Sequence, residues 1–329
     1  MVDNLENQKR AHERRKMKIL VAYDGSHCAN AALEDLKRAG LDTTAEVLVM
    51  TLADVFVPPP IDDEVENTLP YVPEGIKRAH ERAQHKLAQA EALAKRGSEQ
   101  IKSAFPNWHL RHEAQADSPA WALIRTADHW KPDLIVMGAQ GHSVFGGRLI
   151  LGSISQRVLY EARCSVRIAR TSQKEADKPI RLLIAVDNSS DSSAAVDAVC
   201  SRHWPKGSEA GLLAVVDTVL AIAPNPFEPS AVKWIEVADE ENWDQVRQIF
   251  EPSAEKLRQA GLHTEVLIRR GNPADQILEE ADTWGADCIF VGAKGTRGID
   301  RLLLGSVSSA VSARAHCSVE VVRPSNRTA

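Results

Sequence analysis

The sequence predicts two tandem α/β domains, each a Rossmann-like, doubly wound fold with a parallel five-stranded sheet. Two observations in the chain of 329 residues support this prediction. Short, β-prone apolar segments alternate with helical segments, which is typical of right-handed βαβ units. The same order of segments then occurs a second time, at an offset of 153 or 154 residues.

The internal repeat sets the domain boundaries. Gly138 and Gly292 occupy equivalent positions at an offset of 154 residues, whereas Gly152 and Gly305 do so at an offset of 153. The first copy therefore carries one additional residue between these glycines, which we place in the region 145–147. We expect a mobile N-terminal arm over 1–16, a first domain over 17–170, a linker over 171–180 and a second domain over 181–329.

The elements of the first copy follow from hydrophobic periodicity and chain-breaking residues. The apolar segment 18–23 is a buried strand, and Gly40 closes the helix 30–39 that follows it. Prolines make 54–75 a loop, and alanines at helical spacing make 76–103 an amphipathic helix. Pro119 lies in the first turn of a helix that ends at Trp130. The remaining elements are strands at 46–52, 108–114, 133–137 and 165–169, and a helix from Ser153.

The second copy repeats this order after the polar linker. Prolines again mark a long loop, here over 219–232, between the second strand and the following helix. The predicted strands are 181–186, 211–216, 263–269, 287–291 and 319–321, and the predicted helices are 193–200, 243–260, 273–284 and one that begins at Ser306.

Composition excludes several classes of protein. The net charge of −5 and the pI of about 6.1 give no basis for a nucleic-acid-binding surface. Apolar runs are too short for a membrane span, and the polar start of the chain is no secretory signal. The five cysteines show no paired spacing, so we expect reduced thiols and a cytoplasmic location. His109 and His112 fall on opposite faces of a strand, so we expect no metal site there.

A strand, a glycine loop and a helix start occur together in each copy. Gly138 and Gly141 follow one strand, and Gly152-Ser153 begins the next helix. Gly292, Gly295 and Gly305-Ser306 repeat this arrangement. Free N–H groups and the helix dipole at such a position favour an anionic group, so the residues themselves predict a phosphate-bearing ligand. Asp24 and Asp187 follow the first strand of each copy and would face the same crevice.

The duplicated pattern resembles the universal stress protein family in its tandem form. The nucleotide-binding signature of that family is G-x2-G-x9-G-[ST], and the second copy fits it from Gly292 to Ser306. The first copy has ten intervening residues instead of nine, which puts the geometry of its loop in doubt. The resemblance extends over about 18–170 and 181–323 and implies a Rossmann-like fold that binds adenine nucleotide, ATP or else ADP or AMP, together with Mg²⁺.

The resemblance also implies roles for individual residues. Asp24 or Asp187 would hold the adenosine, and the main chain near Thr51 or Val215 would meet the adenine. The loop glycines would approach ribose and phosphate, while the Gly-Ser pairs would bind phosphate with the help of an arginine four residues earlier. The expected nucleotide-binding residues are Ala22, Asp24, Thr51, Gly138, Gly141, Arg148, Gly152, Ser153 and Ile154 in the first copy, and Ala185, Asp187, Val215, Gly292, Gly295, Arg301, Gly305, Ser306 and Val307 in the second.

Simpler structural interpretations stay open for the same residues. The glycines would serve only to let loop and helix pack closely. Asp24 and Asp187, or Ser153 and Ser306, would be helix N-caps. Arg148 and Arg301 would be solvated surface charges.

Three functions remain. The first is an adenine-nucleotide-binding stress-response sensor or regulator without efficient catalysis, because GxxxxGK[ST] and an early GxGxxG are both absent. The second is a slow ATPase or autophosphorylating enzyme that uses Asp24 or Asp187. The third is a nucleotide-free dimerisation module built on the final strands 166–168 and 319–321, which alternate apolar and charged residues as edge strands with one buried face do. Arg167 and Glu320 at equivalent positions suit pairing of the two halves within one chain, followed by homodimer formation with a second chain.

Overall fold

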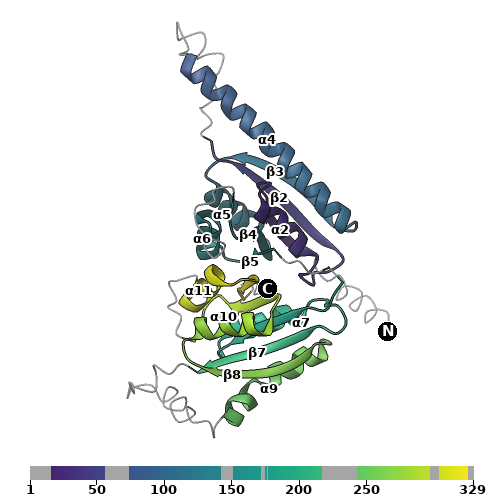
Figure 1. Cartoon of the computed structure of the whole chain (residues 1–329). Coiled ribbons are helices and arrows are strands. Elements are labelled where there is room, and N and C mark those ends of the chain that lie inside the picture. The colour runs from purple at the N-terminus through teal and green to yellow at the C-terminus, as the bar shows by residue number, and fades with distance from the viewer. Residues whose placement is uncertain are drawn as a thin grey trace, which may run out of the picture.

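The computed structural model describes residues 16–55, 74–141, 151–171, 175, 177–216, 243–296 and 304–324. Within these residues the chain forms two α/β halves whose strands join in one ten-stranded sheet, in the order β3-β2-β1-β4-β5-β10-β9-β6-β7-β8 (Figure 1). All neighbouring strands are parallel except β5 and β10, which are antiparallel. The predicted pair of doubly wound, parallel five-stranded sheets is confirmed, and the two sheets meet edge to edge.

In the first half, strands and helices alternate as the periodicity predicts. The helix α2 starts three residues before the predicted position, because Ser26 caps its N-terminus. It also ends three residues earlier than predicted, at Leu36. The elements are β1 (Met17–Ala22), α2 (His27–Leu36), β2 (Ala45–Ala53), α4 (Glu74–Ala104), β3 (His109–Ala116), α5 (Pro119–Trp130), β4 (Leu134–Gly138), α6 (Ser153–Glu161) and β5 (Ser165–Ala169).

The second half has the same order and topology. Its first helix again starts three residues earlier than predicted, here because Ser189 is the N-cap. The elements are β6 (Arg181–Val186), α7 (Ser190–Cys200), β7 (Glu209–Val216), α9 (Trp243–Gln259), β8 (His263–Arg270), α10 (Pro273–Trp284), β9 (Cys288–Gly292), α11 (Ser306–Arg314) and β10 (Ser318–Val322).

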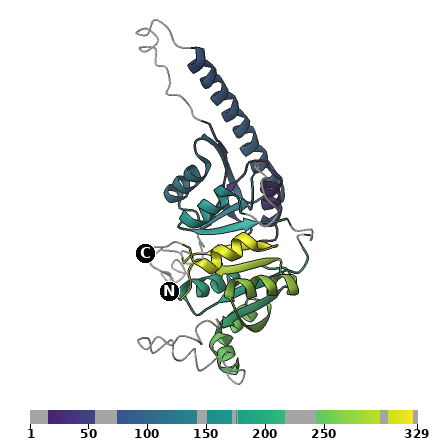
Figure 2. The ribbon, with the colours of Figure 1, turned by 60° about the vertical axis from the view of Figure 1, so that its left-hand side comes forward.

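Helices cover both faces of the sheet. On one face, α2 and α4 enclose an apolar core in the first half, and α7 and α9 enclose another in the second half. On the opposite face, residues beneath α5, α6, α10 and α11 form a single apolar core that runs across both halves. Helix α4 extends far beyond the sheet in both views (Figures 1 and 2). No helix among the described residues has the length and apolar composition that a membrane span needs.

The two halves meet through their final strands, with Glu320 opposite Arg167. The prediction that the two halves pair within one chain through these strands is confirmed. The expectation of one solvated face is wrong, because the side chains of Arg167 and Glu320 are each only 1% exposed. Arg167 donates to Glu320 at 3.1 Å and to Asp35 of α2 at 2.5 Å, and Arg202 after α7 also pairs with Glu320. Helices cover the seam on both sides, so the charged residues of the two strands are paired in the interior rather than on the surface.

Candidate functional site

The candidate sites lie at the carboxyl ends of the strands where the topology reverses. In the first half this switch point lies between β1 and β4, which are hydrogen-bonded neighbours, and in the second half between β6 and β9. Because β1 and β4 are parallel, Asp24 and the first glycine loop leave them at the same end of the sheet. Ligands of open α/β sheets bind at this position, because the connections on either side diverge from it.

The structure brings the acidic residue and the second loop glycine of each half into contact. A Cβ atom at Gly141 would lie 3.0 Å from Asp24 Oδ2, and one at Gly295 would lie 2.5 Å from Asp187 Oδ2. In the second half, Asp187 Oδ2 also accepts the backbone N–H of Thr296 at 2.9 Å. A side chain at either position would therefore push the carboxylate away from the loop, and the shift would be larger at Gly295.

Asp24 and Asp187 are not the N-caps of the following helices. The Oγ of Ser26 accepts the N–H of Ala29 at 3.1 Å, and the Oγ of Ser189 accepts the N–H of Ser192 at 3.1 Å. Each aspartate instead accepts the N–H of the capping serine, at 2.9 Å in the first half and 3.1 Å in the second. The N-cap interpretation of these carboxylates is wrong. Sequence reasoning missed Ser26 and Ser189, two residues later, which are the N-caps.

The first glycine of each loop has a packing role. A Cβ at Gly138 would lie 2.6 Å from the carbonyl carbon and oxygen of Cys28, and one at Gly292 would lie 2.6 Å from the carbonyl carbon of Asp191. No side group larger than hydrogen fits between β4 and α2, or between β9 and α7. The interpretation that the glycines let loop and helix pack closely is therefore supported at Gly138 and Gly292. Gly141 and Gly295 instead lie against the carboxylates of Asp24 and Asp187.

The Gly-Ser pairs form helix N-termini without a capping side group. Gly152 and Gly305 are the N-cap residues of α6 and α11, and neither helix has a capping bond from a side chain. Ser153 and Ser306 are the first helical residues and are exposed, so the interpretation of these serines as caps is wrong. The first N–H groups of both helices are thus presented without a cap, which is the arrangement that suits an anion.

Hydrogen bonds fix these helix starts to the ends of the preceding strands. The N–H of Gly152 donates to Ala139 O at 2.8 Å, and the N–H of Gly305 donates to Ala293 O at 2.7 Å. The next serine of each helix strengthens the join, since Ser155 Oγ donates to Gly138 O at 2.9 Å and Ser308 Oγ donates to Ala293 O at 2.9 Å. Each helix N-terminus is held in a defined place beside its glycine loop.

The remaining predicted residues lie near strand ends or helix starts, or outside the described residues. Thr51 is buried near the end of β2, and its Oγ donates to Tyr23 O at 2.6 Å. Ala22 and Ala185 end or nearly end their strands, Val215 lies near the end of β7, Ile154 is 37% exposed, and Val307 packs against the core. Arg148, Arg301 and the additional residue of the first loop lie outside the described residues.

The two sites differ in one carboxylate. Asp191, in the first turn of α7, accepts the N–H of Lys294 at 3.0 Å and so braces the second glycine loop. The equivalent residue of the first half is Cys28. Sequence reasoning missed Asp191, because the predicted helix began at 193 and so left Asp191 outside it; only the observed start at Ser190 places Asp191 in the first turn.

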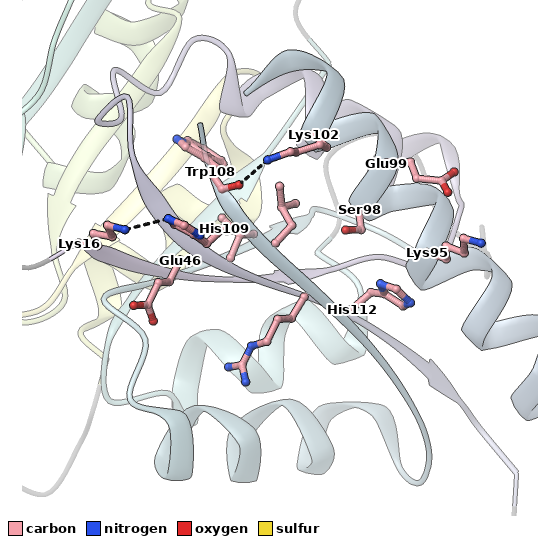
Figure 3. Close-up of a pocket in the computed structure, with 12 residues that line it drawn as sticks. Lys16, Glu46, Lys95, Ser98, Glu99, Lys102, Trp108, His109 and His112 are labelled. Carbon is pink, nitrogen blue, oxygen red and sulfur yellow. Dashed lines mark hydrogen bonds between the residues drawn. The ribbon is translucent and has the colours of Figure 1, made fainter. Parts of the chain in front are cut away.

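A wide groove of about 820 Å³ lies elsewhere on the molecule (Figure 3). It runs between the last turns of α4 and the first residues of β3, and includes Lys95, His109 and His112. Lys102 of this groove donates to Pro106 O at 2.7 Å and Trp108 O at 3.0 Å, so it holds the turn after α4. The groove lies at the amino ends of β2 and β3, the opposite end of the sheet from the glycine loops, and contributes nothing to the candidate sites.

Comparison with known proteins identifies the family. The model of the universal stress protein family matches residues 16–170 and 180–323. The chain belongs to the universal stress protein family. It is of the tandem type, because the two matches follow one another along the same polypeptide.

Some relatives of this universal stress protein match nearly the whole chain, and others match a single half of it. A universal stress protein of Mycolicibacterium smegmatis is 27% identical over 317 residues, which cover 93% of this chain and 97% of the relative. The universal stress protein YxiE of Bacillus subtilis is 31% identical over 147 residues, 44% of this chain and 98% of the relative. The fold is similar to that of a universal stress protein from Archaeoglobus fulgidus, with a TM-score of 0.58 at 20% identity, covering 94% of this chain and 97% of that one.

Proposed function

We propose that this universal stress protein binds adenine nucleotide, ATP in the first instance, at the switch point of each half and acts as a stress-response sensor or regulator in the cytoplasm. The observation that carries the proposal is the convergence of three groups at each switch point. Those groups are the carboxylate of Asp24 or Asp187, the glycine pressed against it, and the uncapped N-terminus of α6 or α11. Family membership supports the same proposal.

The residues present fit an adenine nucleotide. A carboxylate accepts hydrogen bonds from ribose hydroxyls, and the N–H groups of a helix N-terminus donate to phosphate oxygens. The exposed hydroxyls of Ser153 and Ser306 stand beside those N–H groups and supply one more donor each. Any Mg²⁺ would be held mainly by the phosphates, as is usual for this ion in nucleotide sites. ADP or AMP would use the same groups with fewer phosphate contacts.

Asp187 is better placed to hold a ligand than to catalyse a reaction. Both carboxylate oxygens of Asp187 accept backbone N–H groups, from Ser189 at 3.1 Å and Thr296 at 2.9 Å. Each carboxylate oxygen has two lone pairs, so one on each remains for a ribose hydroxyl, while the two backbone bonds favour a fixed carboxylate over one that must take up and release a proton in every turnover. This supports a binding function without efficient turnover over a slow ATPase.

A homodimer of this protein is expected to use a surface other than the final strands. Strand β5 already lies between β4 and β10, and β10 lies between β5 and β9. Neither strand has an unpaired side for a second copy. This favours the nucleotide-binding proposal over a dimerisation module built on these strands.

The test is to denature the purified protein, identify any released nucleotide and count it per chain, and then to titrate the nucleotide-free protein with ATP. Gly141→Ala and Gly295→Ala push a methyl group against Asp24 and Asp187, so each should weaken ATP binding at its own site, Gly295→Ala more than Gly141→Ala. Gly75→Ala is the matched control, because a Cβ there meets nothing within 4 Å. Failure of the parent protein to carry or bind any nucleotide would refute the proposal, and equal binding by all three variants would refute the assignment of the sites.

A further inference from the structure

Two arginines reach across the seam between the halves in a reciprocal manner. Arg170 follows β5 and donates to the carbonyl oxygens of Ser312, at 2.7 Å, and Cys317, at 3.4 Å. Arg323 follows β10 and donates to the carbonyl oxygens of Leu159, at 2.6 Å, and Cys164, at 3.1 Å. Each arginine and its acceptors are exchanged by the 153-residue offset of the repeat. The contacts are therefore one interaction made twice, once in each direction.

The backbone of each arginine is anchored in the same way. The N–H of Arg170 donates to Ser318 Oγ at 3.1 Å, and the N–H of Arg323 donates to Ser165 Oγ at 3.2 Å. Burial lowers the pKa of both guanidinium groups, and that of Arg323 falls to about 10. A group with that pKa is still charged at neutral pH. Each guanidinium thus places a positive charge and directed donors on carbonyls of the other half.

The carbonyls of Leu159 and Ser312 belong to the helices that begin with the Gly-Ser pairs. Helices α6 and α11 have nine residues each, and Leu159 lies six positions after Ser153. At 1.5 Å per residue, the arginine contact lies about 9 Å from the first helical residue. The last carbonyls of a helix lack intrahelical partners, and a cation there complements the helix dipole. Each short helix is therefore held at its start by its own half and near its end by the other half.

The helices α6 and α11 also contact each other directly. Tyr160 Oη and Ser309 Oγ lie 2.5 Å apart, and the two helices lie side by side next to the seam in both views (Figures 1 and 2). This hydrogen bond joins the last turn of α6 to the first half of α11, so each arginine still acts first on the helix whose carbonyl oxygen it contacts.

We propose that Arg170 and Arg323 are crossed positioning residues for the two nucleotide sites. Arg323, in the second half, sets the position of α6 and so the affinity of the first site; Arg170, in the first half, sets α11 and the second site. The inference rests on the proposed function, because it concerns the affinity of those sites. On this proposal the tandem arrangement contributes to nucleotide affinity, since the end of each proposed phosphate-binding helix is held by an arginine of the other half.

The experiment uses the full-length protein with Arg170→Met and Arg323→Met, which keep a long apolar side chain and remove the donors. Matched controls are Arg163→Met and Arg314→Met, which remove exposed arginines near the same helix ends, with side chains 79% and 54% exposed. A photoreactive azido-ATP is titrated, and labelled peptides from each half give the affinity of each site. Amide hydrogen exchange of the nucleotide-free protein at 159–164 and 312–317 reports the helix ends independently of binding.

The expected pattern is crossed. Arg323→Met should weaken the first site about fivefold or more and speed exchange at 159–164, while Arg170→Met should do the same to the second site and to 312–317. Arg323→Lys keeps the charge without the fork of donors and should fall between parent and Met variant. The controls should match the parent protein at both sites.

Two failures are distinguishable. If the parent labels at neither site, the proposed function is refuted and this inference with it. If the parent labels at both sites but each Met variant weakens the site of its own half, or both sites equally, the arginines are general supports of the seam and the crossed inference alone is overturned.

Discussion

Replacing Glu320 with Gln tests whether the buried charges at the seam stabilise the protein. Glu320 is 1% exposed and accepts hydrogen bonds from Arg167 at 3.1 Å and from Arg202 at 2.9 Å. Gln has nearly the same shape but no charge, and its amide group would turn donors toward two guanidinium groups. The variant therefore leaves the buried positive charges of Arg167 and Arg202 without their shared counter-charge.

Removing one partner of a buried ion pair costs about 3–5 kcal/mol, much more than the pair contributes over an apolar replacement. With a urea m-value of about 3 kcal/mol per M, the urea midpoint should fall by about 1 to 1.7 M. Glu209→Gln is the matched control, because Glu209 pairs with Arg181 at 3.1 Å but its side chain is 41% exposed. Exposed pairs contribute at most about 1 kcal/mol, so the control midpoint should shift by about 0.3 M or less.

The assay is urea unfolding at pH 7, followed by tryptophan fluorescence and far-UV circular dichroism. The first transition is compared among parent, Glu320→Gln and Glu209→Gln, since two joined halves need not unfold in one step. If both variants shift the midpoint equally little, the seam charges contribute no more than a surface pair, and the reasoning from burial is refuted.

Three further predictions follow from single sites. Burial alone would raise the pKa of Glu320, but Arg202 and Arg167 outweigh burial and hold the pKa below its ordinary value. The stabilisation that the ionised carboxylate gives the fold is therefore present above the ordinary pKa and is lost as pH falls through the lowered pKa. Urea midpoints between about pH 6 and pH 3 should fall more steeply for the parent than for Glu320→Gln, and parallel curves would contradict this. Gly138→Ala should destabilise by about 1–3 kcal/mol, because its Cβ would meet the backbone of Cys28 at 2.6 Å; Gly75→Ala in α4 is the control, and equal urea midpoints would show that α2 can move away. Burial raises the pKa of the Cys164 thiol to about 11 and that of Cys317 to about 12; mass spectrometry should show iodoacetamide alkylating both far more slowly in native than in unfolded protein, and comparable rates would mean that the seam opens readily.

Strand positions were predicted well because periodicity and apolar runs report burial directly. The strand at 165–169 and the helices at 119–130 and 273–284 have the predicted bounds. Helix starts were predicted less well. Both α2 and α7 begin directly after a serine, and before α7 the segment 188–193 holds several small polar residues that suit an N-cap equally. The hydrogen bond that Ser189 Oγ accepts from the N–H of Ser192 decides among them, and Ser26 Oγ accepts the equivalent bond from the N–H of Ala29.

The environment of the final strands could not be predicted from their pattern. Alternating apolar and charged residues usually mean one solvated face. Here Asp35 and Arg202 come from segments that are distant in sequence, and their charges make it possible to bury Arg167 and Glu320. A local pattern reports the polarity of a side chain but not whether a partner from elsewhere in the molecule will neutralise it.

The contact between each aspartate and its glycine loop likewise depends on tertiary structure. The order of elements alone placed Asp24 and Asp187 at the correct end of the sheet, because parallel strands share their carboxyl ends. The distance from Gly295 to Asp187 follows instead from the way α7 packs on β9, which requires Gly292 to have no side chain. The packing role of the first glycine and the proposed ligand-binding role of the second are therefore linked, because both depend on how closely the glycine loop approaches α7 and the aspartate.

The charges at the seam also bear on which strands pair. Arg167 and Glu320 are equivalent residues of the repeat, and the antiparallel register sets them directly opposite each other. Had β5 instead paired with β5 of a second copy in the same register, Arg167 would face Arg167, and a β10 pair would set Glu320 against Glu320. Like charges directly opposite destabilise a strand pair. Divergence of the two halves at this single position thus favours pairing within the molecule over pairing between copies, and it does so at the seam across which Arg170 and Arg323 reach the two helices.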